Sequence, residues 1–117
     1  MNRAGARAEE LCAELLRGAG LRVLARNWRC RHGEIDLVAE ERGTLVFAEV
    51  RLRRDSRYGG AAESVTAAKR ARLIAAARLY LRRRPDARSE PECRFDVFLL
   101  DALETGRVQW IRNAFGA

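Results

Sequence analysis

Long apolar runs, histidine, proline and lysine are all scarce in this sequence of 117 residues. No apolar stretch approaches the ~20 residues that a membrane-spanning helix needs. The first ten residues, Met1 to Glu10, are charged and lack the apolar core of a signal peptide. We therefore expect a cytoplasmic protein that does not contact a membrane.

The residues that usually build zinc sites and disulfide frameworks are also few. His32 is the one histidine, so a histidine-rich metal site or a Ser/His/Asp triad is not expected. Cys12, Cys30 and Cys93 are odd in number and show no CxxC spacing, which indicates neither a disulfide framework nor a zinc knuckle. We interpret them as reduced structural thiols.

Acidic residues are outnumbered: 16 stand against 23 basic residues, for a net charge of +7. Only Lys69 among the basic residues is lysine, a bias that GC-rich coding DNA can produce without selection for binding. Coding bias explains arginine in place of lysine, but it does not explain the excess of positive charge. Because arginine binds phosphates through planar, bidentate hydrogen bonds, nucleic acid is the leading expected partner.

Linkers, internal repeats and low-complexity tracts are absent, so we expect a single domain over residues 1–117. Hydrophobic periodicity predicts helices at residues 5–18 and 61–84, and strands at 21–30, 33–40, 44–52, 94–100 and 107–111. This order of one helix, three strands, one helix and two strands predicts an α/β (mixed α+β) fold, in which helices flank a sheet of about five strands.

The two strands around Arg42-Gly43 are expected to form a hairpin in which paired residue numbers sum to eighty-five. Asp36 then lies opposite Glu49, and Glu34 lies opposite Arg51. Alternation assigns one apolar face to Ile35, Leu37, Ala39, Val46, Ala48 and Val50. It assigns the other face to Glu34, Asp36, Val38, Phe47, Glu49 and Arg51.

Two carboxylates opposite each other on a hairpin repel, and neighbouring Val38 and Phe47 would weaken the screening by water. A divalent cation such as Mg²⁺ or Mn²⁺ is one solution, because hard cations prefer oxygen ligands. Protonation of one acid, or pairing with Arg51, is the other. The residues alone favour the two solutions about equally. Glu9, at the rim of the buried stripe of the first helix, is either a third acid of this group or a solvated residue favoured by the helix dipole.

Six stretches carry a family resemblance: GARAE with Glu9, NWRCRHGEIDLVAE, TLVFAEVRLRR, YGGAAESVTAAKRARL, RFDVFLL and WIRNAF. Together they resemble the YraN-like uncharacterised protein family, which is similar to Holliday-junction resolvases and other PD-(D/E)XK nucleases. The resemblance implies a restriction-endonuclease-like fold. It further implies an endonuclease, dependent on Mg²⁺ or Mn²⁺, that acts on DNA, including branched recombination and repair intermediates, and works as a homodimer.

The resemblance also implies roles for individual residues. Asp36 and Glu49 match the metal-binding acids of the motif, and Glu9 matches the acid that completes such sites. Arg51 stands where the motif has a catalytic lysine, and arginine stabilises charge without losing a proton near neutral pH. Lys69, from the helix after the sheet, is the candidate replacement. An exposed Lys69 and an Arg51–Glu34 salt bridge are the alternatives.

The loop after the acidic strand carries Arg53, Arg54 and Arg57, which we expect to contact nucleic acid together with Ser64, Thr66 and Lys69. A solvated charged loop is the alternative. Arg70, Arg72, Arg78 and Arg82 to Arg84 are interpreted as the exposed face of a helix, and Trp110 and Phe115 as core or oligomer contacts. Two other functions stay open: a nucleic-acid-binding module without turnover and a protein-interaction domain.

Overall fold

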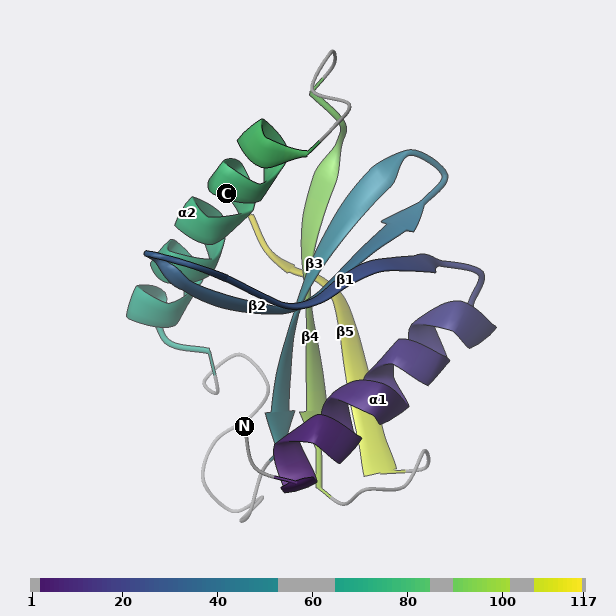
Figure 1. Cartoon of the computed structure of the whole chain (residues 1–117). Helices are drawn as coiled ribbons and strands as arrows, with labels where there is room; N and C mark the ends of the chain where they lie inside the picture. Colours follow the sequence, from purple (N-terminus) through teal and green to yellow (C-terminus); the bar gives the residue numbers. More distant parts are fainter. Residues whose placement is uncertain (1–2, 53–64, 85–89, 102–106, 117) are drawn as a thin grey trace.

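A computed structural model describes residues 3–52, 65–84, 90–101 and 107–116. Its elements run in the predicted order: α1 (Arg3–Gly18), β1 (Arg22–Cys30), β2 (Gly33–Glu41), β3 (Thr44–Leu52), α2 (Ala67–Arg83), β4 (Cys93–Leu100) and β5 (Val108–Phe115). The mixed α+β fold with a five-stranded sheet is confirmed (Figure 1).

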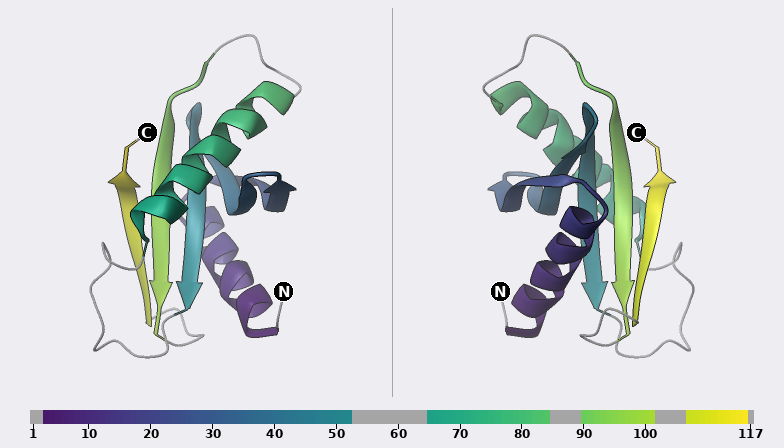
Figure 2. Two further views of the ribbon diagram at one scale, coloured as in Figure 1. Left: turned by 90° about the vertical axis from the view of Figure 1, so that its left-hand side faces the viewer. Right: turned by 90° about the vertical axis from the view of Figure 1, so that its right-hand side faces the viewer.

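The five strands lie in the sheet in their order along the chain, β1-β2-β3-β4-β5. β3 and β4 are parallel, and the other neighbours are antiparallel. Parallel neighbours need a crossover, and α2 provides it. Figure 2 shows α1 and α2 on opposite sides of the sheet, so a helix covers each face of its central strands.

Each helix packs against the sheet over its own apolar core. The α1 core contains Ala8, Cys12, Ala13, Leu16, Leu37, Ala39, Val46, Ala48, Phe98 and Leu100. The α2 core contains Ile35, Val38, Leu45, Phe47, Leu73, Ala76, Ala77 and Phe95. Alternation along β3 therefore divides its residues between the two helices, as predicted. All three cysteines are free, and burial raises the pKa of the Cys12 thiol to about 12.

Two predicted boundaries are wrong. The second helix begins at Ala67 and not at 61, because Thr66 has an extended backbone and its hydroxyl accepts the Lys69 N–H at 3.2 Å. The last strand runs to Phe115 and not to 111, with Phe115 paired to Phe95 and stacked on it at 5.0 Å between ring centroids. This contact agrees with the core interpretation of Phe115.

Asp96 lies at the junction of β4 and β5 and is completely buried. Its carboxylate accepts hydrogen bonds from Arg94 Nε at 3.1 Å, Trp110 Nε1 at 2.9 Å and the Asn113 N–H at 2.9 Å. Arg94 Nη1 in turn donates to Glu41 at 2.7 Å. These bonds join the β2–β3 hairpin to the last two strands and give the buried charge several partners.

In the part of the chain that the structure describes, neither helix combines the length and apolarity required to span a bilayer.

Candidate functional site

The sheet divides where the predicted acids lie. β2 pairs with β3 from Glu41–Thr44 to Leu37–Ala48, in the predicted register, and the pairing ends there. Beyond this point β2 continues beside β1 as far as Gly33, whereas β3 continues beside β4 as far as Leu52. Figure 1 shows the two branches turning away from each other. The division leaves Asp36 and Glu49 at a fork between the strands.

Backbone irregularity accompanies the fork. Ile35 and Leu37 are two residues apart and should share one face of a strand, yet Ile35 packs in the α2 core and Leu37 in the α1 core. The predicted face of Ile35 is therefore wrong, because β2 does not keep a strict alternation of faces between Ile35 and Leu37. On the neighbouring strand Asn27 has a φ of 51°, in the left-handed region that asparagine tolerates.

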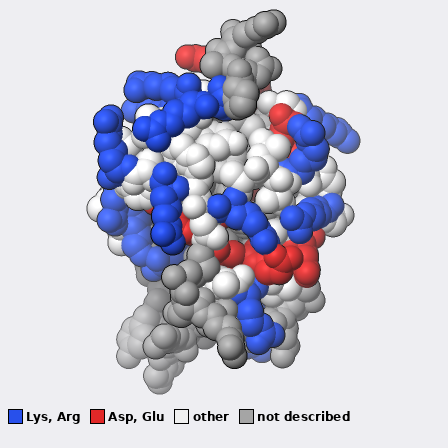
Figure 3. Space-filling view, viewed as in Figure 1, with Lys and Arg blue, Asp and Glu red and all other residues white. Residues whose placement is uncertain are grey.

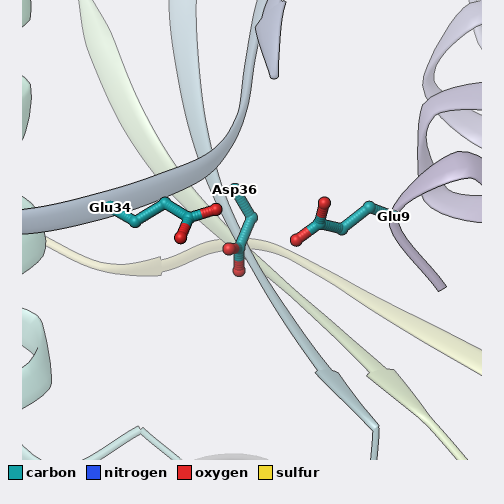
Figure 4. A group of neighbouring side chains, drawn as sticks. All are labelled: Glu9, Glu34 and Asp36. Atoms are coloured by element: carbon teal, nitrogen blue, oxygen red, sulfur yellow. The ribbon is translucent and has the colours of Figure 1, made fainter. Parts of the chain in front are cut away.

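Three carboxylates converge at this fork. Carboxylate oxygens of Glu9, Glu34 and Asp36 all lie within 4.8 Å of one another. Figure 4 shows Glu9 reaching in from α1, and Glu34 and Asp36 from β2. Glu9 is only 8% exposed. Burial and the negative charge of Asp36 raise the pKa of Glu9 to about 7, although a hydrogen bond from Asn27 opposes the shift.

Glu49 joins the group from β3. Asp36 accepts the N–H of Val50, the residue after Glu49, at 2.8 Å, which ties β2 to β3 across the fork. Burial and the nearby Asp36 charge raise the pKa of Glu49 to about 7. Burial also raises the pKa of Asp36, against the lowering effect of the Val50 hydrogen bond. The two acids are thus neighbours, as predicted, although they are not a register pair.

Cationic side chains border these acids. Arg51 Nη1 lies 3.8 Å from Glu49 Oε1. Lys69, from the first turn of α2, lines a cavity of about 160 Å³ together with Glu34 and Glu49. Burial and the positive charge of Arg51 lower the pKa of Lys69, while Glu49 and Asp36 act in the opposite direction. Figure 3 shows that, on this side of the molecule, acidic side chains gather towards the lower right and basic side chains lie around them.

Sequence comparison places the chain among known proteins. It is 50% identical to a UPF0102 protein of Nitrosococcus oceani over 112 residues, which cover 95% of this chain and 90% of the relative. A UPF0102 protein of Pseudomonas putida is 48% identical over 115 residues, covering 97% and 93%. A third, of Methylobacillus flagellatus, is 46% identical over 117 residues and matches end to end. The uncharacterised protein family UPF0102 matches residues 8–100.

The chain belongs to the UPF0102 family. This confirms the YraN-like family that the motifs predicted. The names of these UPF0102 relatives state no activity, so the chemistry of the site has to be argued from its geometry.

The donor set at the fork of this UPF0102 chain suits a hard divalent cation. Its candidate ligands are carboxylate and amide oxygens, which Mg²⁺ and Mn²⁺ prefer. Glu34 Oε1 and Asn27 Oδ1 are buried and accept no hydrogen bond from any described residue. A buried acceptor without a donor is costly, and a cation bound by Glu34 would satisfy its oxygen. The residues present therefore fit the metal.

Sequence reasoning missed two residues of this UPF0102 site. It placed Glu34 on the face of Asp36 but paired it with Arg51; in the structure Glu34 Oε2 lies 3.7 Å from Arg29, and Arg51 pairs with Glu49. Asn27 went unnoticed, since nothing in the pattern marks the left-handed backbone that turns it towards Glu9. The two-residue spacing of Glu34 and Asp36 was an available signal.

The structure bears differently on the predictions for the remaining site residues. Lys69 does lie beside the acids and is partly buried, which excludes the exposed alternative. Thr66 caps α2, and its predicted contact with nucleic acid stays a prediction. Arg53, Arg54, Arg57 and Ser64 lie outside the described residues.

The raised pKa values predict that the metal-free protein loses stability as the pH rises. Glu9 and Glu49 keep protons to about pH 7 in the folded state, whereas their ordinary pKa is 4.5. The folded chain thus binds more protons than the unfolded chain between these values, so the free energy of unfolding falls across the interval. Between pH 5 and pH 8 we expect the free energy of unfolding to fall less in Glu49→Gln than in the wild type, by on the order of 2 kcal/mol.

Urea unfolding in EDTA at pH 5 and pH 8 measures the effect. Glu14, exposed on α1, provides the control, and Glu14→Gln should leave the pH dependence of the wild type unchanged. Equal pH dependence in wild type and Glu49→Gln would contradict the prediction.

Proposed function

We propose that this UPF0102 protein is a metal-dependent nuclease that cleaves phosphodiester bonds in DNA. The convergence of carboxylates from α1 and β2 at the strand fork, with Glu49 beside them, is the observation that carries the proposal. Acids placed this closely repel unless a cation joins them, and buried acceptors without donors point to the same ligand. The resemblance to PD-(D/E)XK nucleases supports the same function.

Glu9, Glu34, Asp36 and Glu49 are the residues that would hold Mg²⁺ or Mn²⁺, with the Asn27 amide oxygen as a further candidate. When bound, such an ion polarises a phosphodiester and lowers the pKa of coordinated water. The Val50 N–H fixes the orientation of Asp36 at 2.8 Å, so this ligand is held by the sheet itself. The fork thus presents converging ligands from α1 and β2, with Glu49 of β3 beside Asp36.

The cations beside the acids would act on the substrate. Arg51 is held near Glu49 and stabilises negative charge that develops on the phosphate, without serving as a base. Lys69 has a pKa below its ordinary value and faces the same acids from α2, so it is the group suited to orient water or move a proton. In this assignment the role of the motif lysine passes to another element of the fold.

The net charge of +7 supports a polyanionic substrate. The resemblance favours branched DNA intermediates as substrates and a homodimer as the active form, and we retain both as proposals. Arg53, Arg54 and Arg57 follow β3 directly along the chain, and their predicted contacts with the DNA backbone belong to the same proposal.

A substrate panel tests the activity. Linear, flapped and four-way DNA, with single-stranded RNA as a further substrate, are incubated with Mg²⁺, Mn²⁺ or EDTA. We expect cleavage that requires the metal and that falls about 100-fold in Lys69→Ala, since a positioned acid–base group contributes about that much. Arg70→Ala removes an exposed cation from the next position of the same helix and should cleave normally. Cleavage in EDTA, or equal losses in the two variants, would contradict the assignment.

A binding module without turnover is the second candidate. Arg51, which replaces the motif lysine, favours it. Salt-sensitive DNA binding without cleavage in either metal would establish this function. A protein-interaction domain would remain if neither DNA nor RNA bound at low salt.

A further inference from the structure

A small cavity separates the acidic fork from the start of α2. It has a volume of about 160 Å³ and is lined by His32, Gly33, Glu34, Glu49, Lys69, Arg72 and Leu73. The β1–β2 turn supplies one wall, α2 supplies the opposite wall, and β3 contributes Glu49. Arg72 lies on the exposed face of α2, as interpreted from the sequence, and also contributes to the wall of a cavity beside the candidate metal ligands.

The charges on this wall are unbalanced. Lys69 and Arg72 are three residues apart, so they lie on the same side of α2. The positive charges of both Arg51 and Arg72 act on Lys69. Of these three cations, Arg51 has the Glu49 ion pair at 3.8 Å, whereas neither Lys69 nor Arg72 forms an ion pair with another described residue. Repulsion between these positive charges, which Glu49 and Asp36 only partly oppose at Lys69, raises the free energy of the folded protein, and a bound anion would reduce it.

The size of the cavity limits the anion. At ~30 Å³ for each molecule of liquid water, 160 Å³ accommodates about five waters. This is room enough for one tetrahedral oxyanion. Arginine and lysine are the side chains that bind phosphate oxygens most readily, through charge-assisted hydrogen bonds.

We propose that this cavity is a phosphate site, in which Lys69 and Arg72 bind one phosphate group of the nucleic-acid substrate and His32 provides a further hydrogen-bonding partner. The assignment rests on the proposed function, since it places the phosphate beside the acids of the fork. It adds two residues, Arg72 and His32, that neither the sequence motifs nor the family assigns.

Glu34 and Glu49 on the opposite wall give the site a second property. Their carboxylates repel a phosphate unless a cation neutralises them, so the phosphate and the divalent cation should each strengthen the binding of the other. This coupling is reciprocal by thermodynamic necessity. It would allow the protein to bind a phosphate tightly only when its metal ligands are loaded.

Isothermal titration with thymidine 3′,5′-bisphosphate, a soluble nucleotide with two phosphate groups, tests the site without any need for cleavage. We expect binding that Mg²⁺ strengthens about tenfold, within the usual range of coupling between sites. Arg72→Gln should weaken binding about tenfold, with and without Mg²⁺, and Arg72→Lys should restore most of it. Arg70→Gln, with the same change of charge on the same helix, should remain within about twofold of wild type.

The outcomes separate this site from the nuclease proposal. Equal weakening in Arg70→Gln and Arg72→Gln, or no binding to the wild type at millimolar bisphosphate, would overturn the phosphate site even if DNA is cleaved. The expected binding pattern without cleavage of any DNA would support the phosphate site and reject the nuclease. An Arg72→Gln variant that binds and cleaves like the wild type would reject the site alone.

Discussion

Replacement of Asp36 by asparagine should abolish metal-dependent cleavage and, in the same protein, increase the stability of the metal-free fold. Asp36 lies between Glu9, Glu34 and Glu49, and its partly buried carboxylate contributes to the raised pKa of both Glu9 and Glu49. An amide of the same size removes one negative charge from this group. Its oxygen can still accept the Val50 N–H, which the carboxylate accepts at 2.8 Å. The fold should therefore keep its fork while the repulsion falls.

We expect cleavage to fall by about 100-fold or more, since loss of even an outer partner of a metal ligand costs 10–100-fold. The free energy of unfolding in EDTA at pH 8 should rise by about 0.5–2 kcal/mol, the usual gain from relief of an unfavourable surface or site charge. Urea unfolding with and without Mn²⁺ measures the second effect. Mn²⁺ should stabilise the wild type and leave Asp36→Asn unchanged.

Glu14→Gln is the matched control, because it removes one negative charge from an exposed position of α1. It should change neither cleavage nor the response to Mn²⁺. The combination of lost activity and gained stability is specific to a ligand role. A purely structural Asp36 would lose stability on substitution, and that result would contradict the metal site.

The second large effect is expected at Asp96, where replacement by asparagine should strongly destabilise the protein. Asp96 is fully buried and accepts hydrogen bonds from Arg94, Trp110 and the Asn113 backbone. The amide loses the charge that balances Arg94 and turns a donor towards groups that are themselves donors. We expect a loss of about 3 kcal/mol, the lower end of the range for a broken buried ion pair, because Glu41 still contacts Arg94.

Urea unfolding at neutral pH measures this loss, which is a large part of the 5–15 kcal/mol that typically stabilises a domain. Glu92→Gln, exposed just before β4, should stay within about 0.5 kcal/mol of wild type. A small effect at Asp96 would mean that the hydrogen bonds of Asn113 and Trp110 are easily replaced by water. It would contradict the view that this residue joins the hairpin to β4 and β5.

Prediction from the sequence worked best where neighbouring residues determine the structure. Arg42 and Gly43 have φ values of 50° and 87°, as a two-residue hairpin turn requires, and this turn sets the register from Glu41–Thr44 to Leu37–Ala48. Alternation of apolar residues then assigned the faces of β3 correctly. It also placed Glu9 at the rim of the buried stripe, where its pKa is raised by burial.

The prediction failed where the sheet divides. A strict alternation places Ile35 on the face of Leu37 and pairs Glu34 with Arg51, but Ile35 packs in the α2 core and Glu34 lies near Arg29. The hairpin pattern contains no information about the point where β2 and β3 separate, beyond which β3 stays paired with β4, a strand more than forty residues further along the chain. The position of Arg72 and His32 in one cavity could not be predicted for the same reason, since a turn and a helix distant in sequence form that cavity.

The sequence by itself determined the element order, the hairpin register, the family and the acids Asp36 and Glu49 as neighbours. All of these depend on spacing within a few residues of the chain, or on motifs read in order. Only the tertiary structure decided that Glu34 and Asn27 complete the acidic group, that Arg51 pairs with Glu49, and that Lys69 and Arg72 face a common cavity. Those contacts arise where strands and helices that are distant along the chain pack against one another, so local periodicity does not determine the side-chain positions at the fork.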